Sequence, residues 1–528
     1  MTQKIDIIII DDPSKSTYPY MDMAIARAYL HKNGIDTNVH FFLPCSVEKY
    51  SNELAIVKPK MVIGLFSYRD AQSMMDALSI IKSMSLDTYI TVSSSMTNIY
   101  HKEFLERFPF IDCVILGEPE ETSLDLYDKV TNNKSLSDCL GISYRNSQGK
   151  IFCNPMRPYI ADLDSLPFAD RSHQKKFVLA HTHMYKNRGC SGTCTFCNDN
   201  CFRNKQSGNY LRFRSAEHVV DEIEHIITKS KNQNYKFSFY DYCFIDGGKK
   251  GIESASEVMN EILRRELKVV LHFQARAEQF NESLMPFLTV AKKAGLASIL
   301  IGIESACDED LKLYGKIAQT NDNLRAIETL RKADIEFQCG FINFNPYSTF
   351  EKIIKNVVFL EKTGLAKSFS FFTTSLDVHP ETDIVKTLIN DKLLPIDFDF
   401  MNVRHQIIWK DPIIYKLLIA LQNVKLNIET HKYIQSIEII FNASRNRLPY
   451  NQAQRLASLE KQFKIDIHEQ AKINVEFMHE CIKLAQCENI DELNLNCRKF
   501  DLSNFDKKIY EMHYMASIFF LRVMRHLA

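Results

Sequence analysis

The chain has 528 residues, with 65 basic and 65 acidic side chains and a formal net charge of zero. One hydrophobic core does not extend over this length, so we expect two or three domains. The balanced charge gives no electrostatic reason to expect nucleic-acid binding, and we expect no membrane span, since long apolar runs are missing. The 14 cysteines and an N-terminus that resembles a buried strand more than a signal peptide favour a reducing, cytoplasmic location.

Strands and helices alternate over the first 140 residues. We expect strands at Lys4–Ile10, Thr37–Phe42, Met61–Phe66, Thr88–Val92 and Cys113–Leu116, and helices at Met21–Asn33, Ala71–Met84, Ile99–Arg107 and Glu120–Val130. Such alternation predicts a doubly wound, Rossmann-like parallel sheet, in which ligands bind at the carboxyl ends of the strands. Residues 141–175 should then form a small hairpin and a linker to the next domain.

A second β/α series occupies residues 176–395. We expect its strands at Phe177–Thr182, Lys236–Tyr240, Val269–Gln274, Ser298–Ile303, Glu336–Phe341 and Ser368–Thr373. These units are too few to close an eight-stranded barrel, so they predict a partial (β/α)6 barrel of the TIM type. Residues 396–528 show helical spacing without alternation and predict a helical C-terminal domain. The expected fold class is α/β with three parts.

Three cysteines, Cys190, Cys194 and Cys197, lie within eight residues of a loop after the first strand of this second series. Three thiolates are one short of the four that hold an ordinary [4Fe–4S] cluster, and would leave one iron open for chemistry. The alternative is a zinc site, which prefers four ligands and could recruit Cys201, His181 or His183. That alternative would make the protein a non-catalytic, colourless binding module.

The C-x3-C-x-aromatic-C spacing, with Phe196 before the third cysteine, resembles the radical S-adenosylmethionine (radical SAM) superfamily. The resemblance implies that the open iron binds the amino and carboxylate groups of SAM. Reductive cleavage then releases a 5′-deoxyadenosyl radical, which abstracts hydrogen from the substrate. The resemblance also implies an electron donor such as a flavodoxin or a ferredoxin.

Residues at the ends of the later strands match segments in which this superfamily binds SAM. The resemblance implies that Asp241 contacts the methionyl amino group, that Arg276 bonds the carboxylate and that Glu304 bonds the ribose hydroxyls. Three further residues of the matched segments are expected to bind the cofactor, and Lys316 also fits the pattern; the three are Gln274, Ser305 and Asn343. The second glycine of the family's segment that begins at Gly340 is absent here.

The first 395 residues also resemble one subgroup, the radical SAM enzymes with an N-terminal cobalamin-binding-type domain. The matching features are the domain order, the segment Gly117-Glu118-Pro119-Glu120 and the late barrel segment Thr374–Thr382. Two departures leave cobalamin binding open. The lower-ligand motif Asp-x-His-x-x-Gly is missing, and Ser93-Ser94-Ser95 stands where relatives usually carry two glycines, which let a flat ring approach the backbone.

Two enzymatic interpretations follow from the resemblance. The first is cobalamin-dependent C-methylation of an unactivated carbon in a natural product or a peptide. The alternative is a cobalamin-free peptide epimerase or a rearrangement or cyclisation enzyme with a vestigial N-terminal domain. An epimerase needs a thiol that donates hydrogen, and Cys243, Cys307 and Cys339 are candidates because they lie near predicted strand ends. Each is also explained as a buried core residue.

Overall fold

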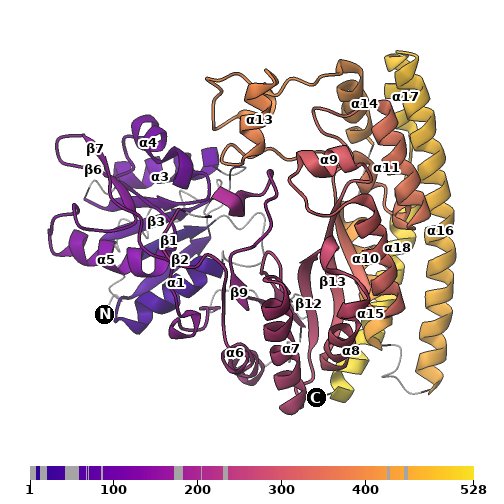
Figure 1. Ribbon diagram of the computed structural model, residues 1–528, viewed down its shortest axis with the longest axis horizontal. Coiled ribbons are helices and arrows are strands. Elements are labelled where there is room, and N and C mark those ends of the chain that lie inside the picture. The colour runs from indigo at the N-terminus through magenta and orange to yellow at the C-terminus, as the bar shows by residue number, and fades with distance from the viewer. Residues whose placement is uncertain are drawn as a thin grey trace.

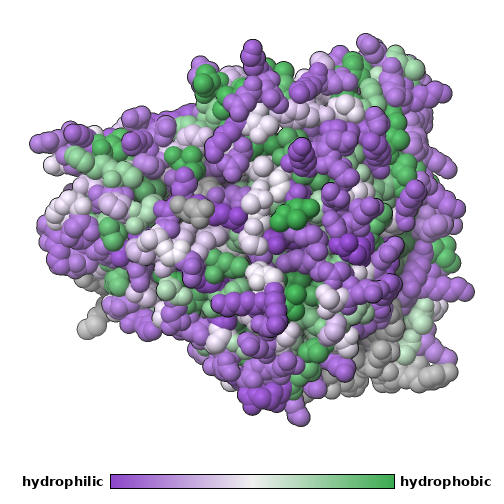
Figure 2. All heavy atoms as spheres, viewed as in Figure 1, coloured by the Kyte–Doolittle hydropathy of each residue, from purple (hydrophilic) through white to green (hydrophobic). Residues whose placement is uncertain are grey.

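The computed structural model describes residues 7–11, 21–41, 59–66, 68, 71–84, 87–171, 182–201, 203, 205–229, 236–424, 428–444 and 450–527. Figure 1 shows a mixed α/β protein in which an N-terminal sheet and a central sheet lie side by side, with the C-terminal helices along the far side of the central sheet. Polar residues cover most of the face seen in Figure 2, and apolar residues are scattered among them.

The N-terminal sheet has the strand order β2-β1-β3-β4-β5-β6-β7. Its first five strands are parallel, in the order typical of doubly wound folds, and are β1 (Ile7–Asp11), β2 (Thr37–Phe41), β3 (Met61–Leu65), β4 (Tyr89–Ser93) and β5 (Cys113–Ile115). The predicted hairpin extends this same sheet with two antiparallel strands, β6 (Ile142–Arg145) and β7 (Ile151–Cys153).

Helices cover both faces of this sheet, since β3 is buried along its whole length and β4 is buried at its middle. Ile63 of β3 packs towards α1 (Met21–Lys32) and α5 (Pro119–Thr131), whereas its neighbour Val62 packs towards α3 and α4. The last two helices span Ala71–Met84 and Thr97–Arg107. The predicted Rossmann-like arrangement is therefore present.

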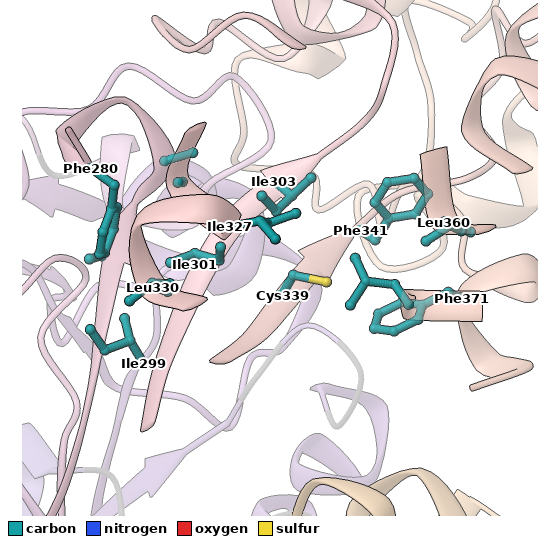
Figure 3. Packing of buried hydrophobic residues seen from close by; sticks show 14 of the residues in the cluster. Phe280, Ile299, Ile301, Ile303, Ile327, Leu330, Cys339, Phe341, Leu360 and Phe371 are labelled. Carbon is teal, nitrogen blue, oxygen red and sulfur yellow. The ribbon is translucent and has the colours of Figure 1, made fainter. Parts of the chain in front are cut away.

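The central sheet is parallel throughout and has the order β14-β13-β12-β11-β8. Its strands are β8 (Thr182–Met184), β11 (Lys236–Phe239), β12 (Val270–Arg276), β13 (Leu296–Glu304) and β14 (Glu336–Phe341). The helices α6 (Ala216–Lys229), α7 (Lys249–Arg264), α8 (Met285–Ala294), α10 (Thr320–Lys332) and α11 (Phe350–Lys362) alternate with the strands. Figure 3 shows the core between them, where Ile301 and Ile303 of β13 meet Ile327 of α10.

The predicted sixth strand, Ser368–Thr373, is wrong. Within it the structure has the short helix α12 (Ser370–Thr373), and only Ser375 pairs in a single parallel bridge with Phe344. The alternation of serine and phenylalanine imitates a strand, but Phe369 packs against Phe477 at a ring distance of 5.9 Å. Contact with the C-terminal helices thus decides the conformation, and the described part of the partial barrel has five strands instead of six.

The C-terminal part is helical, as predicted. It comprises α14 (Pro412–Gln422), α15 (Ile428–Ser444), α16 (Tyr450–Gln486), α17 (Ile490–Lys499) and α18 (Ser503–Leu527). Val270 of β12 and Ala297 of β13 share one apolar cluster with Ile437 of α15 and Ile509 of α18. No helix in the described ranges combines the length and the apolar character that a membrane crossing requires.

Candidate active site

The three cysteines lie on the loop that joins β9 (Asn187–Arg188) to β10 (Arg212–Phe213). This cysteine loop is fastened to the turn after α9 (Asp308–Leu313), where Thr193 Oγ1 donates to the Gly315 carbonyl at 3.0 Å and Thr195 N donates to the Tyr314 carbonyl at 2.8 Å. Gly315 has a φ of +65°, and a Cβ there would lie 2.4 Å from the Thr193 carbonyl oxygen. Glycine at this position is therefore required for the loop to approach.

Cys190, Cys194 and Cys197 are half-buried free thiols. Burial raises the pKa of all three thiols, that of Cys197 to about 12, so a cation or a metal is needed to hold them as thiolates. Across the described ranges, no three His, Cys, Asp or Glu side chains converge as metal ligands. The donor set, three thiols on one loop, suits a cluster with one open iron, since a structural zinc site takes four ligands.

Of the three residues that could complete a zinc site, only His183 has a described side chain, and within the described ranges it joins no group of metal ligands. His183 lies on β8, where its ring stacks on Tyr240 at 5.2 Å, and burial lowers its pKa to about 4. His181 lies outside the described residues. Cys201 ends the short helix η4 (Asn198–Cys201), and its side chain is not described.

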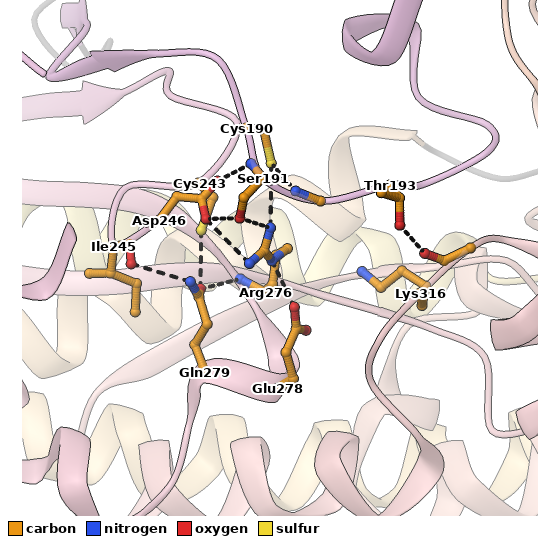
Figure 4. A network of polar contacts seen from close by, with 12 residues as sticks. Cys190, Ser191, Thr193, Cys243, Ile245, Asp246, Arg276, Glu278, Gln279 and Lys316 are labelled. Atoms are coloured by element: carbon orange, nitrogen blue, oxygen red, sulfur yellow. Dashed lines mark hydrogen bonds and ion pairs between the residues drawn. The ribbon is translucent and has the colours of Figure 1, made fainter. Parts of the chain in front are cut away.

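A buried ion-pair network supports the loop beside Cys190 (Figure 4). Asp246 is fully buried, accepts a hydrogen bond from Ser191 N at 2.5 Å and lies 3.2 Å from Arg276 Nη2. Burial raises the pKa of Asp246, but Arg276 and the Ser191 hydrogen bonds outweigh it and hold the pKa below its ordinary value. Sequence reasoning missed this role, since the Asp-Gly-Gly turn at Asp246 indicates a loop and nothing about the partner of the carboxylate.

Glu304 ends β13 in a strained conformation. Its φ is +62°, which costs free energy for a residue other than glycine, and the strand register shifts between Gly302 and Glu304. Its carboxylate lies 3.4 Å from Lys316 Nζ, and a Cβ on Gly302 would lie 2.6 Å from Glu304 Oε1. Burial lowers the pKa of Lys316, but Glu304 and Cys194 outweigh it, so the ammonium stays charged close to the cysteine loop.

Asp241 is buried directly after β11. Its Oδ1 accepts hydrogen bonds from the backbone N–H groups of Lys186, at 2.9 Å, and of Asn187. Its Oδ2 is buried without a hydrogen-bond partner in the described structure, and burial raises the pKa of the carboxyl to about 6. Asp241 thus holds the start of β9 with one oxygen and leaves the other for a ligand. Gln274 lies on the half-exposed side of β12.

The remaining predicted cofactor residues are spread over neighbouring segments. Ser305 is fully buried, and its hydroxyl lies 3.3 Å from Asp310 Oδ2 and 3.2 Å from Asn356 Oδ1, so its contacts are internal. Asn343 donates to the Phe372 carbonyl at 3.1 Å. Phe196 packs edge-on against Tyr314, with ring centres 5.6 Å apart.

The three thiols considered as hydrogen donors are all buried. Cys243 Sγ donates to Gln279 Oε1 at 3.0 Å, and Cys307 Sγ donates to the Lys352 carbonyl at 3.6 Å. Cys339 lies among the apolar core residues in Figure 3, on the side of β14 that carries Phe341 and faces α11. Their surroundings suit core cysteines.

The carboxyl edge of the N-terminal sheet contacts the late barrel segment directly. Ser95 Oγ donates to Glu381 Oε1 at 2.6 Å, and Tyr100 OH donates to the Pro380 carbonyl at 2.9 Å. The Tyr68 ring lies 5.6 Å from that of His379. Ser95 is one of the three serines that stand where the subgroup usually carries two glycines. Glu381 stands between Pro380 and Thr382, where the late barrel segment of the subgroup usually reads Pro-Gly-Thr, so two departures from the pattern contact each other.

The sequence is similar to those of several curated proteins, although no family model matches it. It is 24% identical over 320 residues to an uncharacterised methyltransferase of Pyrococcus horikoshii, covering 60% of this chain and 66% of that protein. It is 28% identical over 278 residues to the anaerobic magnesium-protoporphyrin IX monomethyl ester cyclase of Rubrivivax gelatinosus, covering 50% and 47%. With 4′-phospho-dehydrooxetanocin synthase of Priestia megaterium the identity is 27% over 331 residues, covering 59% and 43%. The chain thus spans less than two thirds of each relative.

Solved structures share the fold. The cobalamin-dependent SAM radical enzyme OxsB, with aqua-cobalamin and SAM bound, superposes with a TM-score of 0.69 at 18% identity and covers 99% of this chain and 80% of its own. The radical SAM methyltransferase TsrM from Kitasatospora setae, with cobalamin and a [4Fe-4S] cluster bound, has a TM-score of 0.55 at 14% identity, covering 73% and 78%. At these identities the likeness establishes the fold.

Proposed function

We propose that this chain is an enzyme of the radical SAM superfamily, in the subgroup with an N-terminal cobalamin-binding-type domain, and that it methylates an unactivated carbon of a small natural product or a peptide. The proposed cofactors are a [4Fe–4S] cluster, SAM and cobalamin, with a flavodoxin or ferredoxin as the electron donor. We assign residues 1–140 to cobalamin, 141–175 to the connection, 176–395 to the cluster and SAM, and 396–528 to the helical cover of the barrel.

The observation that carries the proposal is the cysteine loop held at the carboxyl end of the central sheet beside the Glu304–Lys316 pair. A cluster bound there would supply the electron that cleaves SAM to a hydrogen-abstracting radical. Cys190, Cys194 and Cys197 would be its ligands. The carboxylate of Glu304 offers an acceptor pair for the ribose hydroxyls, and the unpaired Oδ2 of Asp241 suits the methionyl ammonium.

The alternative is a cobalamin-free radical SAM enzyme, such as a rearrangement or cyclisation enzyme. One observation favours it: the Ser95–Glu381 hydrogen bond of 2.6 Å joins the carboxyl edge of the N-terminal sheet to the barrel, where a doubly wound domain binds its ligand. The three candidate hydrogen donors do not favour epimerisation, since the thiols of Cys243, Cys307 and Cys339 are each buried.

Anaerobic reconstitution with iron, sulfide and hydroxocobalamin, followed by desalting and a visible spectrum, tests the proposal. We expect a brown cluster chromophore, a retained corrinoid band and formation of 5′-deoxyadenosine from SAM under reduction. A brown protein that cleaves SAM but retains no corrinoid would favour the alternative. A colourless protein with stoichiometric zinc would refute both.

A further inference from the structure

Arg276 contacts the sulfur of a proposed cluster ligand. It is the last residue of β12, its side chain is 14% exposed, and its Nη1 lies 3.7 Å from Cys190 Sγ. A Cβ on Gly192 would lie 3.1 Å from the same Nη1 and 3.3 Å from Cys190 Sγ. The guanidinium and the thiol therefore meet in a narrow space that a larger residue at position 192 would close.

The guanidinium is held on its other sides as well. Nε lies 2.7 Å from Glu278 Oε1, Nη2 lies 3.2 Å from Asp246 Oδ1, and Nη1 also donates to Ser191 Oγ at 2.9 Å (Figure 4). Two carboxylates and a hydroxyl thus hold the plane of the Arg276 guanidinium, so its orientation towards Cys190 does not depend on a ligand.

These contacts change the expectation that Arg276 binds the SAM carboxylate. An arginine has five N–H donors, and the two on Nη1 donate to Ser191 Oγ and Cys190 Sγ. The Nε N–H makes no hydrogen bond and contacts Glu278 by charge alone. The carboxylates of Glu278 and Asp246 already compensate the positive charge of Arg276, so a third carboxylate, that of SAM, would gain little from it. The contacts favour a role directed at the cysteine.

We infer that Arg276 tunes the reduction potential of the cluster through the Cys190 sulfur, acting as a positioning residue that touches a ligand rather than SAM. The inference rests on the proposed function. A cation that donates a hydrogen bond to a ligand sulfur stabilises the reduced, more negative cluster and raises its potential. The same contact opposes the burial that disfavours the Cys190 thiolate.

The test is the midpoint potential of the reconstituted cluster, measured by a redox titration followed by electron paramagnetic resonance in the absence of SAM. Arg276→Gln removes the charge and the fork, Arg276→Lys keeps the charge alone, and Arg264→Gln is the control, since Arg264 is 68% exposed on α7. Iron and sulfide content establish that each variant carries a full cluster, and SAM affinity is measured in parallel.

We expect Arg276→Gln to shift the potential to more negative values, Arg276→Lys to shift it less, and Arg264→Gln to keep the wild-type value. If Arg276→Gln does not assemble a cluster, the shift in Arg276→Lys decides. Wild-type potentials in both Arg276 variants, with full clusters, would overturn the inference. A loss of SAM affinity with an unchanged potential would show that Arg276 binds the SAM carboxylate instead. A wild-type protein that takes up no cluster would overturn the proposed function itself.

Discussion

The two sheets present the carboxyl ends of their parallel strands to the proposed site in different ways. At the central sheet, the residues around the cysteine loop are buried charges in compensated pairs, Asp246 with Arg276 and Glu304 with Lys316. At the N-terminal sheet, Ser95 and Tyr68 contact the late barrel segment through one hydrogen bond and a ring contact. Buried charges are costly unless they are paired. The carboxyl edge of the central sheet is therefore suited to charged ligands, whereas that of the N-terminal sheet contacts the late barrel segment of the same chain.

The largest effect should follow from removing a cysteine of the loop. We expect Cys194→Ala to abolish both cluster assembly and SAM cleavage, because two thiolates cannot hold the cluster. Iron content and 5′-deoxyadenosine formation measure this. Cys487→Ala is the control, since Cys487 is exposed and lies outside the proposed site. Full turnover in Cys194→Ala, or in the alanine variant of Cys190 or Cys197, would contradict the assignment of these cysteines as cluster ligands.

The Glu304–Lys316 pair should separate SAM binding from cluster binding. We expect Glu304→Gln to weaken SAM binding about 10- to 100-fold, the range for a lost hydrogen bond to a charged group, and to leave the iron content intact. Equilibrium dialysis of the reconstituted protein measures the affinity, with the exposed Glu309→Gln as its control. Loss of the cluster in Glu304→Gln would show that the residue supports the loop instead.

The N-terminal edge can be opened by replacing both residues of the Ser95–Glu381 hydrogen bond with glycine. We expect the double variant Ser95→Gly, Glu381→Gly to bind hydroxocobalamin about tenfold more tightly than the wild type, because the ligand no longer has to break a charged hydrogen bond. A spectral titration measures it, with Glu106→Ala on α4 as a control that removes an exposed carboxylate. Weaker binding in the double variant would mean that Glu381 holds the corrinoid.

The ion pairs between the connecting segment and α6 are expected to affect the stability of the fold more than SAM cleavage. Glu222 of α6 is 2.7 Å from Arg171 of the connecting segment and 2.6 Å from Arg214. Burial raises the pKa of Glu222, but the two arginines outweigh it and lower the pKa to about 2. Its stabilisation is thus fully present above its ordinary pKa, near 4.5, and is lost as pH falls towards 2.

We expect Glu222→Gln to lose about 3 kcal/mol of stability at neutral pH, since it leaves two buried arginines without their carboxylate. Between pH 4.5 and 2 the variant should be less sensitive to acid than the wild type. Denaturant unfolding at several pH values measures both effects, with the exposed Glu217→Gln as control. Parallel pH profiles for wild type and variant would contradict the ion-pair account.

The sequence alone predicted most elements of both sheets, because apolar runs and their spacing report burial directly. The helix α3 and the strand β14 begin and end where the sequence predicts. The three loop cysteines could be found from their spacing, since metal ligands on one loop are close in sequence.

Tertiary structure decided what depends on contacts between distant segments. Packing of Phe369 against Phe477 turned a predicted strand into a helix, and the hairpin joined the N-terminal sheet through pairing with β5. Asp246 and Arg276 lie 30 positions apart in the chain, and Ser95 and Glu381 lie 286 apart. Neither pair has a local pattern, because a buried ion pair or hydrogen bond between loops is fixed only when the elements that carry them pack together.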